Sequence, residues 1–407
     1  CWPEDRLGAM PDDMVVGVPA HVDGRGIDIA GEAGAHLINR DRMWHYTEGM
    51  ANWDPIWPDH GIRIIPGPSS LWFDAEGNRL PAPLIPGADT VATMKHILST
   101  GHGYSWFVLN GAIVAKEFLF SGSEQNPDLT DKQVKKLVGK VTAGIPEPVR
   151  KFMDNGEDWV IAETLEELVA GMNRVAGVPE ALIGDGAGAD QGSSLDDGPS
   201  SASPAPDADS GAEADAAANS AAEADARADA AVDDATAPVG GDRGDAGIDG
   251  DADTFDDVVD AHPVDADPAD PSSSPVPILD VDHLRRQIEA RDRQTVNAFS
   301  KDYQVNYVHV ARKFLGDKIV RSVPQKPILD PNEGPLIAVR LRMLTRKTLG
   351  GIETDLDGRV MRHDGTPIEG LFAAGEASGF GGGGVHGNNA LEGTFLGGCI
   401  FSGMRAG

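Results

Sequence analysis

The stretch GLFAAGEASGFGGGGVHGNNALEGTFLGGCIFSGM, residues 370–404, decides the fold. It begins as a short apolar strand that ends at Glu376, passes through a glycine-rich loop at 379–387, and finishes in an apolar helix from about Thr394 to Met404. This order is expected where an open parallel sheet holds a nucleotide-like ligand at its carboxyl edge. Glycines let the backbone approach a ligand, and a helix start offers unpaired N–H groups and partial positive charge. A flexible loop would be equally glycine-rich, so the motifs in the rest of the sequence must distinguish a ligand-binding loop from an ordinary one.

The segments outside this stretch predict a mixture of helices and strands. Residues 24–38 read as a helix followed by a short strand, and the Asp357-Gly358 pair predicts a hairpin between 352–355 and 359–361. Residues 44–68, rich in aromatic residues and proline, are expected to form irregular loops. Further strands are expected at 70–73, 104–109 and 335–341, and further helices at 89–100, 111–119, 130–139, 147–154, 163–176, 281–300 and 303–315.

An acidic stretch from 184 to 277 interrupts this pattern. It holds 24 Asp and Glu residues against Arg227 and Arg243, and Phe255 is its one aromatic residue. A segment this polar and like-charged cannot bury enough apolar surface to offset the entropy of ordering it, so we expect a disordered insert. About 22 of the chain's 31 net negative charges lie there.

The composition excludes several classes of protein. A net charge of −31 repels nucleic acid, which argues against a nucleic-acid-binding role. The two cysteines, Cys1 and Cys399, provide neither a disulfide framework nor metal-ligand spacing, which fits a reducing, cytoplasmic compartment. No apolar run approaches the roughly 18 residues that span a membrane.

Several motifs together resemble the flavin-binding end of fumarate reductases, succinate dehydrogenases and 3-ketosteroid dehydrogenases. Chains of that superfamily end with Gly-Gly-Ile or Gly-Gly-Val, a variable hairpin, Gly-Leu-Tyr-Ala-Ala-Gly-Glu, and a glycine-rich approach to a last helix. The matching elements here are Gly350-Gly351-Ile352, the turn near Asp357, Gly370 to Glu376, and GVHG at 384–387 with Asn389, Leu391 and Gly393. The resemblance covers nearly everything except the acidic insert, and it implies FAD as the cofactor.

The resemblance also implies roles for individual residues. The residue that matches Glu376 binds a hydroxyl of the flavin's sugar-alcohol chain, and those that match Thr394 and Phe395 present backbone N–H groups to the ring. A helix start in that position stabilises negative charge on the ring. The other expected cofactor-binding residues are Gly350, Gly351, Gly375, Gly384, Asn389 and Gly393.

Four residues are candidates for proton transfer. Glu76 and Arg79 match the superfamily's Glu-x-x-Arg relay, with a surface ion pair as the alternative. His386 would lie beside the flavin, and Lys347 stands where dicarboxylate reductases have a histidine; structural roles are the alternative for both.

The departures from the superfamily narrow the expected substrate. Ala390 stands where dicarboxylate reductases keep an arginine that holds a substrate carboxylate. Losing a bidentate guanidinium removes charge-matched recognition, which argues against fumarate or succinate. A ketone-bearing or more apolar small molecule fits better.

The sequence predicts an α/β protein that has an incomplete Rossmann-like FAD-binding domain, an α+β capping domain and the disordered insert. An FAD enzyme of this kind also needs a strand, a GxGxxG turn and a helix, and we expect these upstream of residue 1. The expected division is 1–40 and 346–407 for the FAD domain, 41–183 and 278–345 for the cap, and 184–277 for the insert.

The expected activity is that of an FAD-dependent dehydrogenase or reductase that moves hydride at a carbon–carbon bond, with an electron partner that the sequence does not identify. Two alternatives remain open at this point. One is a truncated, non-catalytic fragment that cannot hold FAD alone. The other is an acidic interaction protein that recruits a basic partner through the insert.

Overall fold

The computed structural model describes residues 2, 4–8, 10–65, 67–121, 144–183, 275–318, 322–379 and 394–407. The chain divides into two units, one of residues 1–189 with 269–407 and one of residues 190–268. Every element named below belongs to the first unit. The insert from 184 to 274 and the helix expected at 130–139 lie outside the described residues, so both stay predictions.

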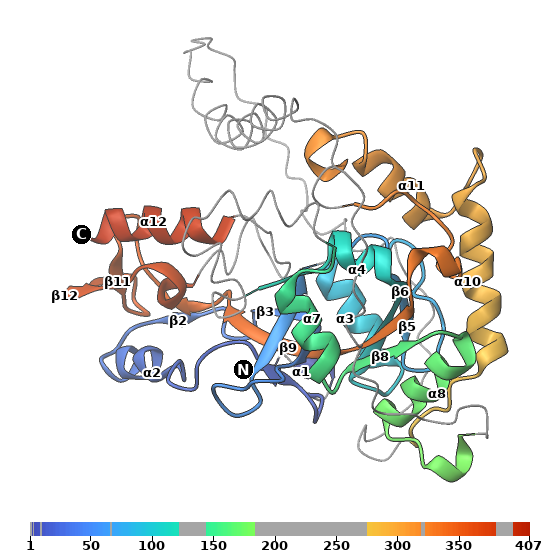
Figure 1. The fold of residues 1–407 in the computed structure, drawn as a ribbon. Helices are drawn as coiled ribbons and strands as arrows, with labels where there is room; N and C mark the ends of the chain where they lie inside the picture. Colours follow the sequence, from blue (N-terminus) through green and yellow to red (C-terminus); the bar gives the residue numbers. More distant parts are fainter. Residues whose placement is uncertain are drawn as a thin grey trace, which may run out of the picture. The chain divides into compact units, whose positions relative to one another are not determined.

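A mixed sheet of eight strands forms the centre of the first unit (Figure 1). The strand order is β5-β6-β9-β3-β4-β7, and β1 and β8 also pair with β9. β1 runs parallel to β9, and the other described pairings of this sheet are antiparallel. The strands are β1 (Val15–Val16), β3 (Met43–Ala51), β4 (Gly61–Ile65), β5 (Leu71–Asp74), β6 (Tyr104–Asn110), β7 (Leu119–Phe120), β8 (Trp159–Ala162) and β9 (Leu336–Thr348).

The core forms around β6, whose seven residues are all buried. Trp106 and Phe107 are fully buried on this strand and pack with Phe73 of β5 and Phe118 after α4. A strand buried on both faces needs layers above and below, which helices supply here. These and the other helices are α1 (Glu4–Leu7), α3 (Thr90–Ser99), α4 (Gly111–Glu117), α7 (Glu147–Asn155), α8 (Leu165–Ala176), η1 (Glu180–Leu182), α10 (Val281–Thr295), α11 (Tyr303–Ala311) and η4 (Pro331–Glu333).

Residues 44–68 correct the expectation of irregular loops, because β3 and β4 form there. Met50, Ile62 and Ile64 are buried in the core, and Met50 pairs with Ile62. Proline and tryptophan suggested loops, but Trp53, Pro55, Trp57 and Pro58 lie between the two strands, where the chain turns, and Trp44 lies within β3. The aliphatic residues on either side supply the buried face that a strand needs.

A smaller cluster forms from two segments far apart in the sequence. α2 (Arg25–Glu32) and β2 (Leu37–Ile38) pack against β10 (Gly351–Ile352) and the antiparallel pair β11 (Arg359–Met361) and β12 (Pro367–Phe372). Their buried residues are Ala30, Ala35, Ile352 and Val360. The expected hairpin at Asp357-Gly358 is confirmed by backbone hydrogen bonds from the Asp355 N–H to the Arg359 carbonyl and from the Met361 N–H to the Glu353 carbonyl.

The strand that leads into the glycine-rich loop differs from expectation. β12 pairs antiparallel with β11, whereas the strand order had suggested a place in an open parallel sheet. Within the described residues the parallel pairing is that of β1 with β9, and it does not include β12. Trp2, Leu7 and Met14 pack on the main core rather than on the smaller cluster. None of the described helices is both long and apolar enough to cross a membrane.

A buried polar network connects α4 with α10. The carboxylate of Glu117 accepts hydrogen bonds from the Ser69 N–H (2.8 Å), the Ser69 hydroxyl (2.7 Å) and the Val323 N–H (2.7 Å). Gln325 donates to the Ser69 hydroxyl (2.8 Å) and accepts from the fully buried guanidinium of Arg291 (2.8 Å). Burial raises the pKa of Glu117 to about 7 in spite of these bonds.

We predict that Glu117 makes the fold less stable as pH rises from about 4.5 to about 7. Over that range the unfolded chain has lost this proton while the folded chain still holds it, so deprotonation favours unfolding. Glu117→Gln removes the effect, which at 1.36 kcal/mol per pKa unit amounts to roughly 3 kcal/mol. The measurement is the free energy of urea unfolding of both proteins at pH 5 and pH 8.

The difference between the two proteins is the informative quantity, because His45 acts in the opposite direction. Burial lowers the pKa of His45 to about 3, so its contribution to stability grows as pH rises. Between pH 5 and pH 8, the free energy of unfolding of Glu117→Gln should rise relative to that of the unaltered protein. A difference that does not change with pH would contradict the assignment, and exposed Glu289→Gln is the control.

Candidate functional site

Glu376 lies in η5 (Gly375–Ser378), which follows β12. Gly375 has φ of 65°, a left-handed conformation that favours glycine, and it turns the chain out of the strand. The Glu376 carboxylate accepts a hydrogen bond from the Thr348 N–H at 3.2 Å. This acidic side chain is therefore fixed at the carboxyl end of β9, the long strand that passes through the core.

Two glycines form a close junction at the same place. A Cβ atom on Gly350 would lie 1.9 Å from the carbonyl oxygen of Asn39, and one on Gly351 would lie 2.5 Å from the carbonyl oxygen of Ala377. Backbone from three segments meets here, so no larger residue fits. The structure thus gives these glycines a role in chain packing, and their expected contact with the cofactor stays a prediction.

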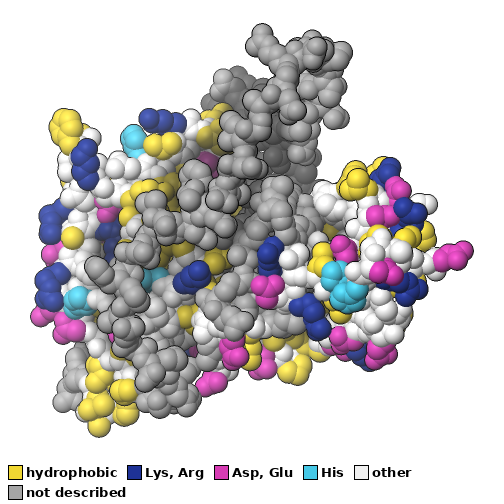
Figure 2. Space-filling view, turned by 180° about the vertical axis from the view of Figure 1, so that it is seen from behind, with side chains coloured by type: hydrophobic (Ala, Val, Ile, Leu, Met, Phe, Trp, Pro, Cys, Tyr) yellow, Lys and Arg dark blue, Asp and Glu magenta, His cyan; other side chains and the backbone are white. Residues whose placement is uncertain are grey.

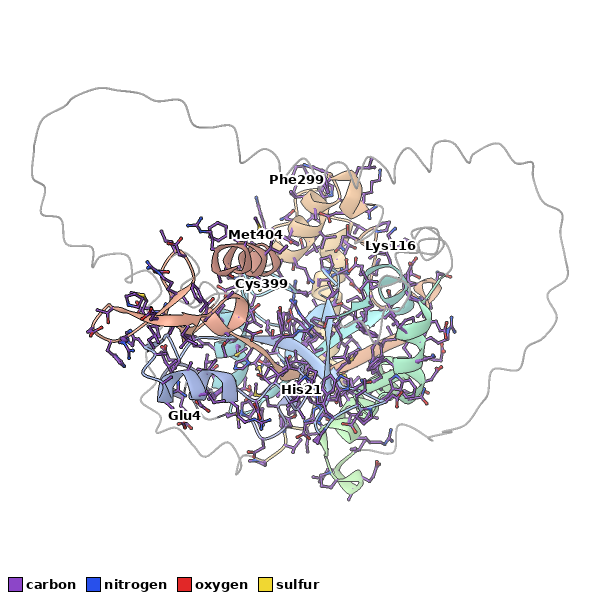
Figure 3. The ribbon with its side chains drawn as sticks, turned by 90° about the vertical axis from the view of Figure 1, so that its left-hand side faces the viewer. Glu4, His21, Lys116, Phe299, Cys399 and Met404 are labelled. Atoms are coloured by element: carbon purple, nitrogen blue, oxygen red, sulfur yellow. The ribbon has the colours of Figure 1, made fainter. Side chains whose placement is uncertain are left out.

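The last helix, α12 (Thr394–Ala406), packs directly on η5. The Gly375 N–H donates to the Ser402 hydroxyl at 2.8 Å, and Gly375 faces Cys399. Five residues separate Thr394 from Cys399, so the start of the helix lies about 8 Å along the axis from the point of contact. η5, which contains Glu376, and α12 therefore pack together, and Figure 3 labels Cys399 and Met404 on this helix.

Several expected site residues cannot be placed. Gly384, His386, Asn389 and Gly393 lie outside the described residues. Thr394 and Phe395 are described as the backbone that begins α12, and Lys347 as backbone in β9 that pairs with Trp44. The side chains of these three residues lie outside the described part of the chain.

This arrangement fits FAD in its chemistry. A carboxylate suits a sugar-alcohol hydroxyl, since an ionised acceptor forms strong hydrogen bonds. The N–H groups in the first turn of α12 have no partner within the helix, so they suit a ring carbonyl. Glu376 and the backbone of Thr394 and Phe395 would hold the cofactor here.

Arg79 lies in a second place, bound to a carboxylate that sequence reasoning missed. Its guanidinium donates to both oxygens of Asp302 (2.5 and 3.1 Å) and to Gln304 (3.2 Å). Although burial raises the pKa of Asp302, the bonds and charge of Arg79 hold it below its ordinary value. The pair is mostly buried, with side chains 24% and 11% exposed, so the guanidinium is held in one orientation.

Glu76 is exposed and does not share this pair. Its carboxylate accepts from the Asn78 amide at 3.3 Å. The turn after β5 has Gly77 at φ of 82° and directs Glu76 outward, while Arg79 returns beside Phe73. The pairing of Glu76 with Arg79 that their spacing suggested is replaced by Arg79 with Asp302. The 223 residues between them left no sequence signal for that contact.

A cavity of about 260 Å³ opens beside Arg79. The apolar part of its wall is of the kind that buries uncharged ligands, and on the polar part the guanidinium supplies a fixed hydrogen-bond donor. The lining residues are Trp72, Arg79, Leu80, Ala82, Leu84, Ile85, Pro86, Lys301, Asp302, Tyr303 and Gln304. The candidates thus form two groups, one around Glu376 at the carboxyl end of β9 and one around Arg79 in the turn after β5.

The FAD binding domain family matches residues 1–396. The chain belongs to this family. Membership confirms FAD as the cofactor expected from the sequence, and it confirms the α/β class at the level of a mixed fold.

Two relatives in mycobacteria carry the name KsdD-like steroid dehydrogenase. That of Mycobacterium tuberculosis is 46% identical over 407 residues, which is 100% of this chain and 54% of the relative. That of Mycolicibacterium smegmatis is 46% identical over 395 residues, 97% of this chain and 54% of the relative. The chain therefore spans about half the length of these relatives. The solved structure of a 3-ketosteroid delta1-dehydrogenase from Sterolibacterium denitrificans has a TM-score of 0.48 and 14% identity, over 96% of this chain and 47% of that one.

We predict that Glu376→Gln weakens FAD binding by roughly tenfold to a hundredfold. A hydrogen bond to a charged acceptor contributes about 1.5 to 3 kcal/mol, and the amide lacks that charge. Titration of the purified protein with FAD, followed by quenching of flavin fluorescence, gives the dissociation constant. Glu369→Gln, an exposed residue of β12, is the matched control. Equal losses in the two variants would remove Glu376 from the site.

Proposed function

We propose that the protein is an FAD-dependent dehydrogenase or reductase that transfers hydride at a carbon–carbon bond of a ketone-bearing or apolar substrate. The observation that carries this is Glu376, held at the end of β9 and packed beside the last helix of an FAD-binding family member. The two mycobacterial relatives, whose names describe steroid dehydrogenases, support the substrate class. When bound, FAD accepts or supplies the hydride.

The residues of the chain would hold and orient the cofactor. Glu376 accepts a hydroxyl of the sugar-alcohol chain, and the backbone N–H groups of Thr394 and Phe395 face the ring. Gly375 permits the turn that places Glu376 there. We also propose the remaining expected roles: Gly350, Gly351, Gly384, Asn389 and Gly393 allow close approach of the backbone.

Arg79 is the proposed catalytic residue, because Asp302 fixes its guanidinium at the wall of a cavity whose lining is part polar and part apolar. Such a guanidinium can donate a hydrogen bond to a ketone oxygen without a change of its own charge. Glu76, Lys347 and His386 are the other candidates for proton transfer. A steroid-sized apolar molecule would meet Trp72, Leu84 and Ile85 on the same wall.

The proposed domain division follows the same logic. Residues 1–40 and 346–407 contribute to the FAD domain, and residues 41–183 and 278–345 form a cap that excludes water from the reacting atoms. The packing of α2 and β2 on β10 supports the first part of this division. We propose a cytoplasmic location from the cysteine content.

We predict that the purified protein with FAD and a dye acceptor oxidises a 3-ketosteroid and not succinate. Arg79→Lys should lower kcat by about a hundredfold, the smaller end of the usual cost of losing a fixed hydrogen-bond donor, because a lysine cannot bridge both oxygens of Asp302. The FAD dissociation constant should stay the same, since Arg79 bonds to Asp302 and Gln304 and belongs to the other group of candidates.

Exposed Arg293→Lys on α10 is the control and should keep its activity. Oxidation of succinate in preference to the steroid would overturn the proposed substrate class. Full activity of Arg79→Lys would overturn the role of Arg79.

A further inference from the structure

One face of α11 leaves large apolar side chains in solvent. The helix buries Gln304, Val305 and Val308, whereas Tyr303, Tyr307 and Val310 are 46%, 44% and 61% exposed. Their spacing of four and three residues puts them on one side of the helix. Further exposed apolar residues occur in the chain directly before and after the helix. We call the set the α11 apolar face: Val296, Phe299, Tyr303, Tyr307, Val310, Phe314 and Leu315.

The composition of this face points to an interaction. Phe299 is 87% exposed and Phe314 is 62% exposed, and the face also holds two of the four tyrosines of the whole chain. Scattered exposed apolar residues are ordinary, but a group of this size marks a binding surface. Tyrosine and phenylalanine together suit a boundary between water and an apolar phase, because each ring is apolar and tyrosine also has a polar tip.

The charge around the face is opposite to that of the whole protein. Lys301, Lys313 and Lys318 are exposed within or beside it. The acidic residues between 296 and 318 are Asp302 and Asp317, and Asp302 is already paired with Arg79. The chain as a whole carries a net charge of −31. Figure 2 shows hydrophobic and basic side chains together at its upper left, at the α10–α11 end of the fold.

We propose that the α11 apolar face attaches the protein to an anionic lipid surface. An apolar stripe with aromatic residues and lysines at its margin is the chemistry of a helix that lies in the plane of a membrane interface. The long lysine side chains reach phosphate groups while their methylene stems lie along the apolar boundary. Figure 3 places Phe299 at the upper margin of the drawn fold, in the turn between α10 and α11.

A second copy of the chain fits this face less well. Pairing two such faces would bring the lysines of both copies together, and each copy carries a large negative charge elsewhere. An anionic lipid surface matches the lysines. At ordinary ionic strength, charges farther away than about 8 to 10 Å are largely screened, so carboxylates beyond that distance do not cancel the local attraction.

The attachment would bring the cavity to the lipid. Tyr303 of the α11 apolar face also lines the cavity beside Arg79, and so does the neighbouring exposed Lys301. An apolar, ketone-bearing substrate dissolves in lipid far better than in water, so a cavity beside the interface receives it at high local concentration. The delivery of substrate from the lipid to the cavity rests on the proposed function, whereas the attachment to the lipid surface does not.

The test is cosedimentation of the purified protein with vesicles, without flavin or substrate. One set contains phosphatidylcholine alone and the other an equal mixture of phosphatidylcholine and phosphatidylglycerol. We expect binding to the mixed vesicles that weakens as salt is added. Val310→Ser with Phe314→Ser should lower the partition coefficient by about tenfold or more. Lys313→Gln should lower it by about fivefold on the mixed vesicles and little on phosphatidylcholine.

The control replaces equally exposed apolar residues elsewhere, Ile29→Ser with Leu356→Ser, which are 65% and 84% exposed. It should bind as the unaltered protein does. Absence of cosedimentation, or equal loss in both double variants, overturns the proposal. So does a dimer that Val310→Ser with Phe314→Ser converts to a monomer with no change in vesicle binding. Vesicle binding without steroid oxidation would overturn the proposed function alone.

Discussion

At Gly350 and Gly351 three stretches of backbone come so close together that a single methyl group would not fit. Asn39, at the end of β2, approaches from one side, and Ala377 and Gly379 approach from the other. This junction keeps η5 against the end of β9, where Glu376 bonds to the Thr348 N–H. The position of α12 follows, because that helix packs on η5 through Gly375 and Ser402. The geometry of the candidate flavin site therefore depends on the absence of two side chains.

β9 relates this junction to the rest of the fold. Its first half pairs with β6 and β8 in the buried core, and its second half pairs with β3 before the chain reaches Gly350. Arg79 lies beyond β5, the neighbour of β6, so the cavity beside it adjoins the buried core. The buried core at β6 holds the Arg79 guanidinium in one orientation. The close junction at Gly350 and Gly351 holds the Glu376 carboxylate. The protein thus fixes opposite charges in two places along one sheet.

Local pattern predicted much of the fold, and contacts between distant segments account for what it missed. The helices at α3, α4, α8 and α10 and the strands at β5 and β6 are confirmed, because their periodicity and caps are properties of adjacent residues. Thr164, for example, caps α8 together with Glu167. β3 and β4 were missed, since Trp53, Pro55 and Trp57 between them resemble loop residues while burial depends on β9.

The same division holds for the candidate site: its local motif was predictable from the sequence, and its long-range contact was not. Gly375 and Glu376 stood out through a motif of consecutive residues, and membership of the FAD binding domain family confirms the cofactor. The bond from Arg79 to Asp302 joins residues on either side of the acidic insert, so no pattern of neighbouring residues predicts it. Glu76 was preferred because it is three residues away, but the turn at Gly77 directs it to solvent.

Gly351→Ala tests the central claim most directly. The added methyl group would lie 2.5 Å from the Ala377 carbonyl, so η5 and Glu376 must move, at a cost of roughly 1 to 3 kcal/mol. The account predicts a circular dichroism spectrum like that of the unaltered protein and an FAD affinity about tenfold to a hundredfold lower. Gly26→Ala, in α2 with nothing near the new methyl group, should bind FAD normally. An unchanged FAD affinity in Gly351→Ala would contradict the claim that this junction positions the flavin site.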